Sequence, residues 1–499
     1  MNYYSSFAAI MPILVVLVTG MAVLLADSCL PVWRRHKLLS ATVSLIGIVV
    51  AAIIAYQRLD SGASDLAFSG AIIVDTFAQS CNLILLVTAA LAVLLAITYL
   101  ENRRLHLGEY YALVLLSTAG SMLMAATNDL IVLFVAIETL SVALYVLAGF
   151  ARTEERSEEA ALKYFLLGAF AAGFLLYGIA LIYGGSAGAV QGGGGTTNLA
   201  AIAANLKGAP QPSAMLMTGI ALVIVGLGFK AALVPFHMWT PDVYEGAPTS
   251  VTAYMAAGAK IAAFAALLRL FNALIPISAY WLVVVQVLAI LTMFGGNLIA
   301  IVQENVKRML AYSSIAHAGY LMVAISALSS EQAHASAVGA LTFYLLAYSL
   351  MTMGAFAVLI WLSRRGHDVQ TLSDLKGLGK NDPTAAYVML VFMLSLGGIP
   401  PTMGFLGKWF IFAAALQAGQ TWLAITLAVA SMISIYYYLK IVWMMCFQEP
   451  DRDIAVPRAL SPSGVVVSVA ITVAATLLFG VVPNLLSMLT NSGVNLPHP

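Results

Sequence analysis

The sequence predicts an all-α polytopic membrane protein with about fourteen transmembrane helices. Of its 499 residues, 62% are hydrophobic and only 9% are charged, whereas soluble domains carry about 25% charged residues. About 20 apolar residues cross a ~30 Å hydrocarbon core as a helix, and stretches of that length fill almost the whole chain. The formal net charge of +1, with no basic patch or tail, argues against a nucleic-acid partner.

The predicted spans are separated by short connections. The connection between the fourth and fifth spans consists of Asn128 and Asp129, which predicts a tight turn. The fourteen spans cover residues 8–29, 38–57, 74–100, 109–127, 129–150, 160–184, 214–239, 248–273, 277–302, 306–328, 336–363, 384–417, 420–447 and 463–490.

Lysine and arginine are divided unequally between alternate connections. Connections after odd-numbered spans contain sixteen of these residues, whereas those after even-numbered spans contain three, Arg58, Lys207 and Arg269. Cytoplasmic loops of membrane proteins are enriched in lysine and arginine. We therefore expect both termini and Gly193 to face away from the cytoplasm, and Arg364 to face it.

Two predicted spans contain helix-breaking residues. Pro235 interrupts the seventh span, and the run Gly397-Gly398-Ile399-Pro400-Pro401 interrupts the twelfth. Two broken helices five spans apart suggest that spans 4–8 and 9–13 are related halves, with opposite topology because five is odd. Discontinuous helices in inverted repeats are a known transporter architecture. The expected divisions are residues 1–108, 109–273 (first repeat), 277–447 (second repeat) and 448–499.

Four charged residues lie far inside these apolar stretches: Glu138, Lys230, Lys260 and Lys408. A charge at the bilayer centre costs at least a few kcal/mol, and such residues usually mark proton or ion paths. Glu138 must pair with a base from another helix or be protonated. A buried lysine can bind and release protons. One acid and three lysines therefore indicate a proton path, and a purely structural ion pair is the alternative for Glu138.

Four further residues are weaker candidates for the same path. His317 lies mid-span near two serines, and His237 follows Pro235 by two residues; histidine can shuttle protons, although helix packing is the rival interpretation for both. Tyr348 could line a hydrated path or simply pack. Lys163 begins the sixth span and is typical first of an interface anchor.

Several segments resemble a known family, the antiporter-like (Mrp-type) membrane subunits of respiratory complex I, bacterial NADH–quinone oxidoreductase. The likeness covers roughly residues 100–450 and is to the subunit N group, since position 408 is lysine where the subunit M group has glutamate. The segments that carry it are NDLIVLFVAIETLSVALYVLAGF (128–150), EAALKYFLLGAF (159–170), FKAALVPFHMWTPDVYEGAPT (229–249) and KRMLAYSSIAHAGY (307–320).

The resemblance implies a role for each candidate. Glu138 and Lys230 would form the acid–lysine pair of the first half-channel, Lys260 would link the halves, and His317 would lie between Lys260 and Lys408. Lys408 would exchange protons near the outer side, and Lys163 would lie at the inner edge of the charged axis.

The resemblance also implies a proton-translocating translocase subunit in a bacterial inner membrane, with both termini periplasmic. This chain would hold no cofactor and no metal, because NADH, FMN, iron–sulfur clusters and quinone would be bound by other subunits. Its partners would be the other membrane subunits and the lipid bilayer. Two alternatives remain open: a subunit of a multi-subunit cation/proton antiporter, and a membrane scaffold with vestigial charges.

Overall fold

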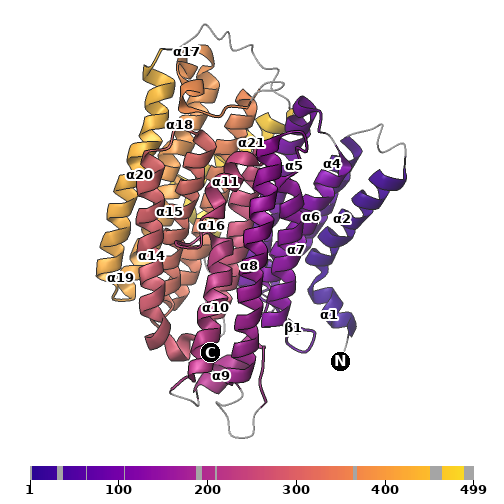
Figure 1. Ribbon diagram of the computed structural model, residues 1–499, viewed down its shortest axis with the longest axis vertical. Coiled ribbons are helices and arrows are strands. Elements are labelled where there is room, and N and C mark those ends of the chain that lie inside the picture. The colour runs from indigo at the N-terminus through magenta and orange to yellow at the C-terminus, as the bar shows by residue number, and fades with distance from the viewer. Residues whose placement is uncertain are drawn as a thin grey trace.

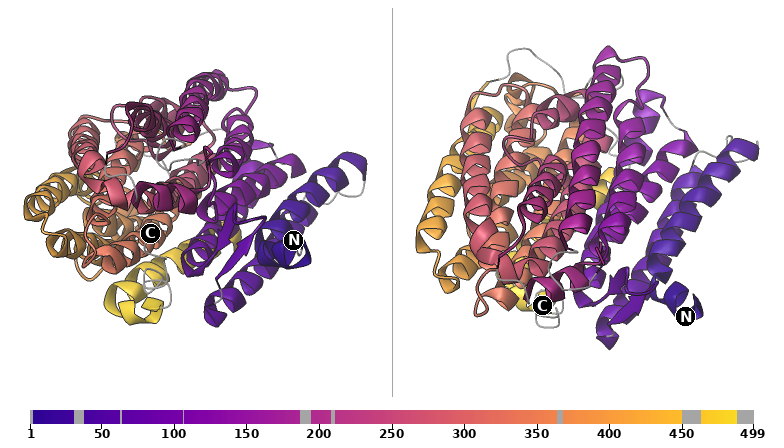
Figure 2. Two further views of the ribbon diagram at one scale, coloured as in Figure 1. Left: turned by 90° about the horizontal axis from the view of Figure 1, so that it is seen from below. Right: turned by 60° about the horizontal axis from the view of Figure 1, so that its bottom comes forward.

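The computed structural model describes residues 3–30, 38–62, 64–105, 107–186, 194–207, 211–363, 368–449 and 463–487. It is a bundle of long, roughly aligned helices (Figure 1). The N-terminal helices lie at one end of the bundle and α20 lies at the opposite end, as the views of Figures 1 and 2 agree.

Most of the helices lie where the sequence predicted a span. In chain order they are α1 (Tyr3–Ala9), α2 (Met11–Cys29), α4 (Leu38–Ser61), α5 (Thr76–Arg103), α6 (Gly108–Ala125), α7 (Leu130–Ala148), α8 (Glu155–Ser186), α9 (Leu199–Lys207), α10 (Ala214–Ala231), α11 (Trp239–Gly246), α12 (Thr249–Tyr254), the π-helical turn η2 (Met255–Ala259), α13 (Lys260–Ala273), η3 (Ile275–Ile277), α14 (Ser278–Ile301), α15 (Val306–Ala327), α16 (His334–Leu362), η4 (Leu372–Leu375), α17 (Leu378–Asn381), α18 (Pro383–Gly397), α19 (Met403–Gln417), α20 (Thr421–Phe447), α21 (Ser463–Val481) and η5 (Pro483–Leu486).

The structure confirms the predicted fold class. Within the described residues, twelve helices are long and apolar enough to cross a membrane. The predicted span 109–127 is α6, which is not among those twelve and carries Glu109 in its first turn. The predicted span 384–417 is the pair of shorter apolar helices α18 and α19.

One small sheet was not predicted. Strands β1 (Asp65–Ala67) and β2 (Ile72–Val74) pair antiparallel in the connection after α4. Ile72 bridges to Thr127, and Asp129 bridges to Asn198, so this hairpin, the α6–α7 turn and the start of α9 meet on one face. We call it the lower face, since β1 and α9 lie at the lower end of Figure 1. It holds connections after even-numbered spans.

Arg269 corrects one part of the sequence interpretation. It was assigned to a connection, but it lies within α13 and is buried. Its Nη1 and Nη2 donate to Oδ2 and Oδ1 of Asp75, each at 2.6 Å, and its Nε donates to the carbonyl of Ala125 at 3.2 Å. A bidentate arginine–carboxylate pair is strong and directional. Arg269 therefore ties α13 to α5 and does not count as a loop residue.

The first break, between α10 and α11, confirms that the seventh span is discontinuous. Ala232 adopts the left-handed conformation with φ +61°. Its N–H donates to the carbonyl of Phe229, and the N–H of Leu233 donates to that of Gly228. This pair of hydrogen bonds is the Schellman motif that ends many helices.

The second break, between α18 and α19, repeats this geometry. Gly398 is left-handed with φ +82°. Its N–H donates to the carbonyl of Ser395, and the N–H of Ile399 donates to that of Leu394, which is the same spacing as in the first break. The recurrence of one cap five spans later agrees with the predicted inverted repeat.

Helices at the centre of the bundle differ from those at its periphery in burial. The most apolar window of the helix from Thr249 to Ala273 is 100% buried, and the windows of α15 and α16 are 94% and 89% buried. The windows of α2, α8 and α21 are each only 33% buried, which leaves apolar side chains on the outside, as lipid or membrane partners require. Central helices can therefore shelter charged groups from lipid.

Candidate functional site

The buried charges of both halves lie on helices that pack in sequence, α10 on α13, α13 on α15 and α15 on α19. Lys230 ends α10, Lys260 begins α13, and Lys408 lies in α19. Their relative exposures are 6%, 2% and 5%, and that of His317 on α15 is 0%. The structure therefore brings the three lysines and His317 into the protein interior.

Glu138 and Lys230 are close in space but are not in ion-pair contact. Glu138 Oε1 is buried and has no hydrogen-bond partner among the described residues. Lys230 Nζ instead donates to the hydroxyl of Tyr145 at 3.4 Å and lies 5.2 Å from the centres of the Tyr145 and Tyr164 rings. The Glu138 charge still acts on Lys230. Lys230 therefore contacts Tyr145, where the sequence predicted an ion pair with Glu138.

Sequence reasoning missed Tyr145, although a signal was present. Tyr145 follows Glu138 by seven residues, or about two helical turns, so both lie on one face of α7. Gly168 on α8 makes room for it: a Cβ at Gly168 would lie 2.0 Å from the Tyr145 hydroxyl. A glycine is thus needed here so that this hydroxyl can reach Lys230.

Lys260 is held at the interface of α13 with α15 and α16. Its Nζ donates to the backbone carbonyl of Ser314, and it lies 5.3 Å from the centre of the Tyr348 ring. The π-helical turn η2 comes directly before Lys260. Such turns are frequent at functional sites because they reposition the following side chain. Tyr348 is thus a direct neighbour of Lys260, and Ser314 is a contact that the sequence did not indicate.

Both ring nitrogens of His317 are engaged. Tyr344 on α16 lies 2.6 Å from Nδ1, and Tyr438 on α20 lies 3.0 Å from Nε2, hydroxyl to nitrogen. Which group donates depends on the tautomer. Tyr438 is buried, whereas its neighbour Tyr436 is 61% exposed. His317 therefore connects three helices.

Lys408 has a fully hydrogen-bonded ammonium group. Its Nζ donates to the carbonyls of Leu396 and Gly397 at 2.9 and 3.0 Å and to Ser431 Oγ at 2.9 Å. The carbonyls belong to the last turn of α18, where partial negative charge accumulates. The Tyr320 ring centre lies 5.1 Å away. Lys408 on α19 thus bonds to the end of α18 across the second break.

The remaining predicted residues lie outside this group of contacts. His237 lies in the segment between α10 and α11, and its buried Nδ1 has no hydrogen-bond partner among the described residues. Lys163, whose side chain is 41% exposed, forms ion pairs with Glu159 at 2.7 Å and Asp242 at 2.8 Å. Lys163 is therefore a rim residue on the upper face, opposite β1 and α9.

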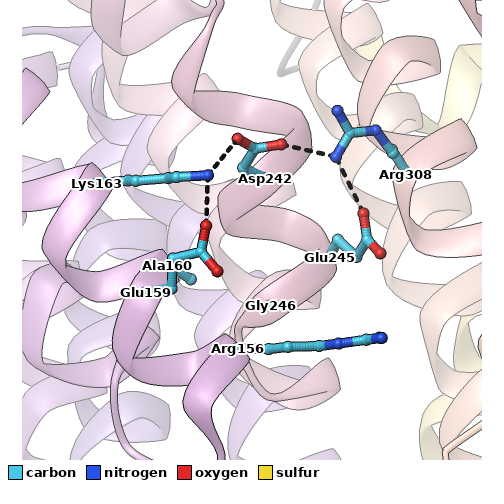
Figure 3. A pocket seen from close by; sticks show the side chains of 8 residues that line it. All are labelled: Arg156, Glu159, Ala160, Lys163, Asp242, Glu245, Gly246 and Arg308. Atoms are coloured by element: carbon cyan, nitrogen blue, oxygen red, sulfur yellow. Dashed lines mark hydrogen bonds and ion pairs between the residues drawn. The ribbon is translucent and has the colours of Figure 1, made fainter.

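A charged pocket of about 210 Å³ opens beside Lys163 (Figure 3). Asp242 bridges the halves, because its Oδ2 accepts from Lys163 and its Oδ1 accepts from Arg308 at 2.7 Å. Partial burial raises the pKa of Asp242, but the hydrogen bonds from Lys163 and Arg308 outweigh this effect, so its pKa lies below the ordinary value. Arg308 also pairs with Glu245 at 3.0 Å. The pocket residues are Arg156, Glu159, Ala160, Lys163, Asp242, Glu245, Gly246 and Arg308.

The arrangement of buried lysines, histidine and hydroxyl groups can support proton transfer. Within the described ranges, no group of three or more His, Cys, Asp or Glu side chains could hold a metal ion. Several buried polar atoms near the lysines have no protein partner in the described part of the chain, and such atoms are normally satisfied by water. They are Glu138 Oε1, Tyr164 OH, His237 Nδ1, Thr240 Oγ1, Ser314 Oγ and Thr352 Oγ1.

Comparison with known proteins gives consistent results. A family model described as NADH:quinone oxidoreductase/Mrp antiporter, TM, matches residues 126–434. The NADH-quinone oxidoreductase subunit N of Trichlorobacter lovleyi is 42% identical over 488 residues, which cover 98% of this chain and 96% of that protein.

Solved structures agree in fold. A chain of respiratory complex I from Thermus thermophilus has a TM-score of 0.78 and 37% identity, covering 95% of this chain and 98% of its own. A chain of the Mrp complex from a Dietzia species has a TM-score of 0.82 at 23% identity, covering 99% of this chain and 97% of its own, which shows a shared fold. The chain belongs to the NADH:quinone oxidoreductase/Mrp antiporter family of membrane subunits.

Proposed function

We propose that this chain is the proton-translocating subunit N of a bacterial NADH–quinone oxidoreductase. The observation that carries the proposal is the series of buried protonatable side chains on successively packed helices, Lys230, Lys260, His317 and Lys408. Glu138, whose Oε1 is buried, acts on Lys230 at the start of this series. Buried charges are costly in a membrane, so a series of them requires a function. The near-full-length similarity to subunit N supports this assignment.

Neighbouring hydroxyl groups allow the series to conduct protons. The Lys230 ammonium contacts the Tyr145 hydroxyl on the side of Glu138. His317 has a tyrosine hydroxyl at each ring nitrogen, so the imidazole takes up a proton on one nitrogen and releases one from the other. Lys260 and Lys408 store protons on either side of His317. Lys163, His237 and Tyr348 would assist at the rim, at the first break and under Lys260.

The proposal places the energy source elsewhere. Quinone reduction by NADH, with FMN and iron–sulfur clusters, would take place in other subunits and drive the protonation changes of this chain. Its partners would be the other membrane subunits. Residues 109–273 and 277–447 would form the two half-channels, flanked by residues 1–108 and 448–499.

A subunit of a multi-subunit cation/proton antiporter is the second candidate. The observation that favours it is the TM-score of 0.82 with the Mrp complex chain. The higher identity to complex I proteins favours the first candidate. Purification of the protein with its natural partners separates the two, because only the first predicts co-isolation with NADH-oxidising subunits.

Glu138→Gln tests the function directly. The amide keeps the shape of the side chain but cannot carry a proton or a charge. We expect proton uptake into vesicles to fall by about a hundredfold while subunit content is unchanged. Glu158→Gln is the matched control, since Glu158 is exposed near the start of α8. Normal pumping by Glu138→Gln would refute the proposed path.

Orientation in the membrane is tested by chemical labelling. We propose that the lower face, with both termini, is periplasmic; Gly193 and Arg364 lie outside the described residues, so Lys207 on α9 and Lys380 on α17 serve as markers. In a variant without Cys29, Cys81 and Cys446, a cysteine at 207 should react with an impermeant reagent on intact cells. A cysteine at 380 should react only after lysis. The reverse pattern would invert the topology.

A further inference from the structure

Another lysine is buried near the upper face, outside the series described so far. Lys307 is the second residue of α15, and its Nζ donates to the carbonyl of Ala247 at 2.6 Å. It lies at the start of the predicted span 306–328 and begins the family segment 307–320. A lysine at a helix start on the membrane surface would normally extend into water. Lys307 instead points into the protein.

Lys307 lines a small cavity near the upper face. The cavity has a volume of about 30 Å³, which is enough for a water molecule. Two buried polar atoms of its lining, Asp368 Oδ1 and Arg103 Nε, have no partner among the described residues. Asp368 Oδ2, by contrast, accepts from Tyr99 at 2.9 Å and from Thr249 at 3.1 Å. The unpaired atoms therefore favour water beside Lys307.

This cavity shares three lining residues with the open pocket of Figure 3. Arg156, Glu245 and Gly246 line both. The charged groups that act on Lys307 come from several elements: Glu245 on α11, Arg103 on α5, Asp368 after α16 and Glu154 before α8. Arg156 also lines the cavity, so three acids and two arginines surround Lys307, and these charged groups favour water that connects it with the upper-face solvent.

The helix that carries Lys307 leads to the central lysine. Ser314 follows Lys307 by seven residues, so it lies two turns away on the same face, about 10 Å along α15. Its carbonyl accepts from Lys260 Nζ, and its buried Oγ lies near the hydroxyls of Tyr244 and Tyr348 without a hydrogen bond of good geometry. Lys307, Ser314 and Lys260 thus lie in succession from the upper face to the centre of the bundle.

We propose that Lys307 is the relay that receives protons from the charged upper-face pocket and passes them by way of Ser314 to Lys260. This inference rests on the proposed proton-translocating function. In the first step a hydronium ion in the cavity water gives its proton to the Lys307 amine, so that the amine becomes an ammonium and a water molecule remains. In the second step the ammonium gives up one proton through water and the Ser314 hydroxyl, and the Lys260 amine becomes an ammonium.

A structural role for Lys307 predicts a different outcome. Ala247 is the C-cap residue of α11, so a fixed cation there would stabilise the end of that helix. Arginine would serve this role as well, because it is always charged and donates hydrogen bonds. Arginine cannot release a proton near neutral pH, so it fails as a relay. The Lys307→Arg variant therefore separates the two roles.

The experiment compares variants of the whole purified complex in vesicles. Lys307→Arg should assemble normally and lower proton uptake by about a hundredfold, and Lys260→Met should do the same. Lys307→His, which keeps a titratable group, should retain more uptake than Lys307→Arg. Lys380→Met is the control, since Lys380 is exposed on the same face. The deficit of Lys307→His should grow as the pH of the upper-face solution rises, because proton supply then becomes limiting.

Two results would contradict the proposal in distinguishable ways. Full uptake by Lys307→Arg, with loss in Lys260→Met, overturns the relay and leaves the proposed function intact. Full uptake by Lys260→Met overturns the proposed function, and the relay with it. The Lys307→Arg complex could also assemble poorly. If Lys307→His then loses uptake equally at all pH values, the role of Lys307 is structural and the relay is overturned.

Discussion

Lys230 and Lys408 flank equivalent breaks, after α10 and after α18, yet their ammonium groups have different neighbours. Both breaks have a left-handed cap residue and the same pair of Schellman hydrogen bonds. Lys408 follows its break and donates to three oxygen atoms, two of them carbonyls of the broken helix. Lys230 precedes its break and has one long hydrogen bond, to Tyr145, among three aromatic rings.

This difference indicates two kinds of proton site. A lysine ammonium has three donors, and Lys408 uses all of them on atoms whose positions the fold determines. Lys230 relies on cation–π contacts and on groups that a rotation can move, the Tyr145 hydroxyl and the Glu138 carboxylate. We infer that the first half responds to rearrangement of its side chains, whereas the second half holds its proton in a fixed site.

The largest expected effect is that of Lys408→Arg. Arginine keeps a positive charge and donors for the Leu396 and Gly397 carbonyls, so the second break should survive. Because arginine does not exchange its proton, coupled proton uptake should fall by about a hundredfold. Electron transfer and proton uptake should be measured together. An active Lys408→Arg would show that only a fixed charge is needed and would remove the relay role.

Gly168→Ala should have an intermediate effect and is specific to the first half. The new methyl group would collide with the Tyr145 hydroxyl, so the ring must rotate away from Lys230. We expect proton uptake to fall by about tenfold with the complex assembled, since ~1.4 kcal/mol of lost interaction corresponds to that factor. Gly173→Ala is the control on α8, because nothing lies within 4 Å of its Cβ. Equal activity of both variants would separate Tyr145 from the path.

The smallest effects concern the two caps. Ala232→Gly should stabilise the protein by about 1 kcal/mol, because glycine adopts positive φ without strain. Gly398→Ala should destabilise it by about 1–2 kcal/mol, since alanine is strained there and its Cβ would lie 2.9 Å from Lys408 Cδ. Thermal dissociation of the purified complex measures both. Stability changes of opposite sign in the two variants would confirm that the caps are equivalent. Changes of the same sign would show that they are not.

Local sequence was sufficient for most of the spans, for the two breaks and for several of the buried protonatable residues. Hydropathy over about 20 residues depends only on consecutive side chains, and proline breaks a helix through its own ring and missing N–H. The same reasoning identified Lys230, Lys260, His317 and Lys408, all of which are buried. The hairpin β1–β2 escaped it, because three-residue strands are too short to give a periodic pattern.

Only the tertiary structure decided which atoms these residues meet. The partners of Lys408 come from α18 and α20, those of His317 from α16 and α20, and Asp75, the partner of Arg269, precedes α5. Contacts of this kind join segments separated by tens to hundreds of residues, and no local pattern encodes them. Burial also depends on every surrounding helix, which is why the sequence assigned Arg269 to a connection and did not mark Lys307 as an interior residue, although both are buried in the fold.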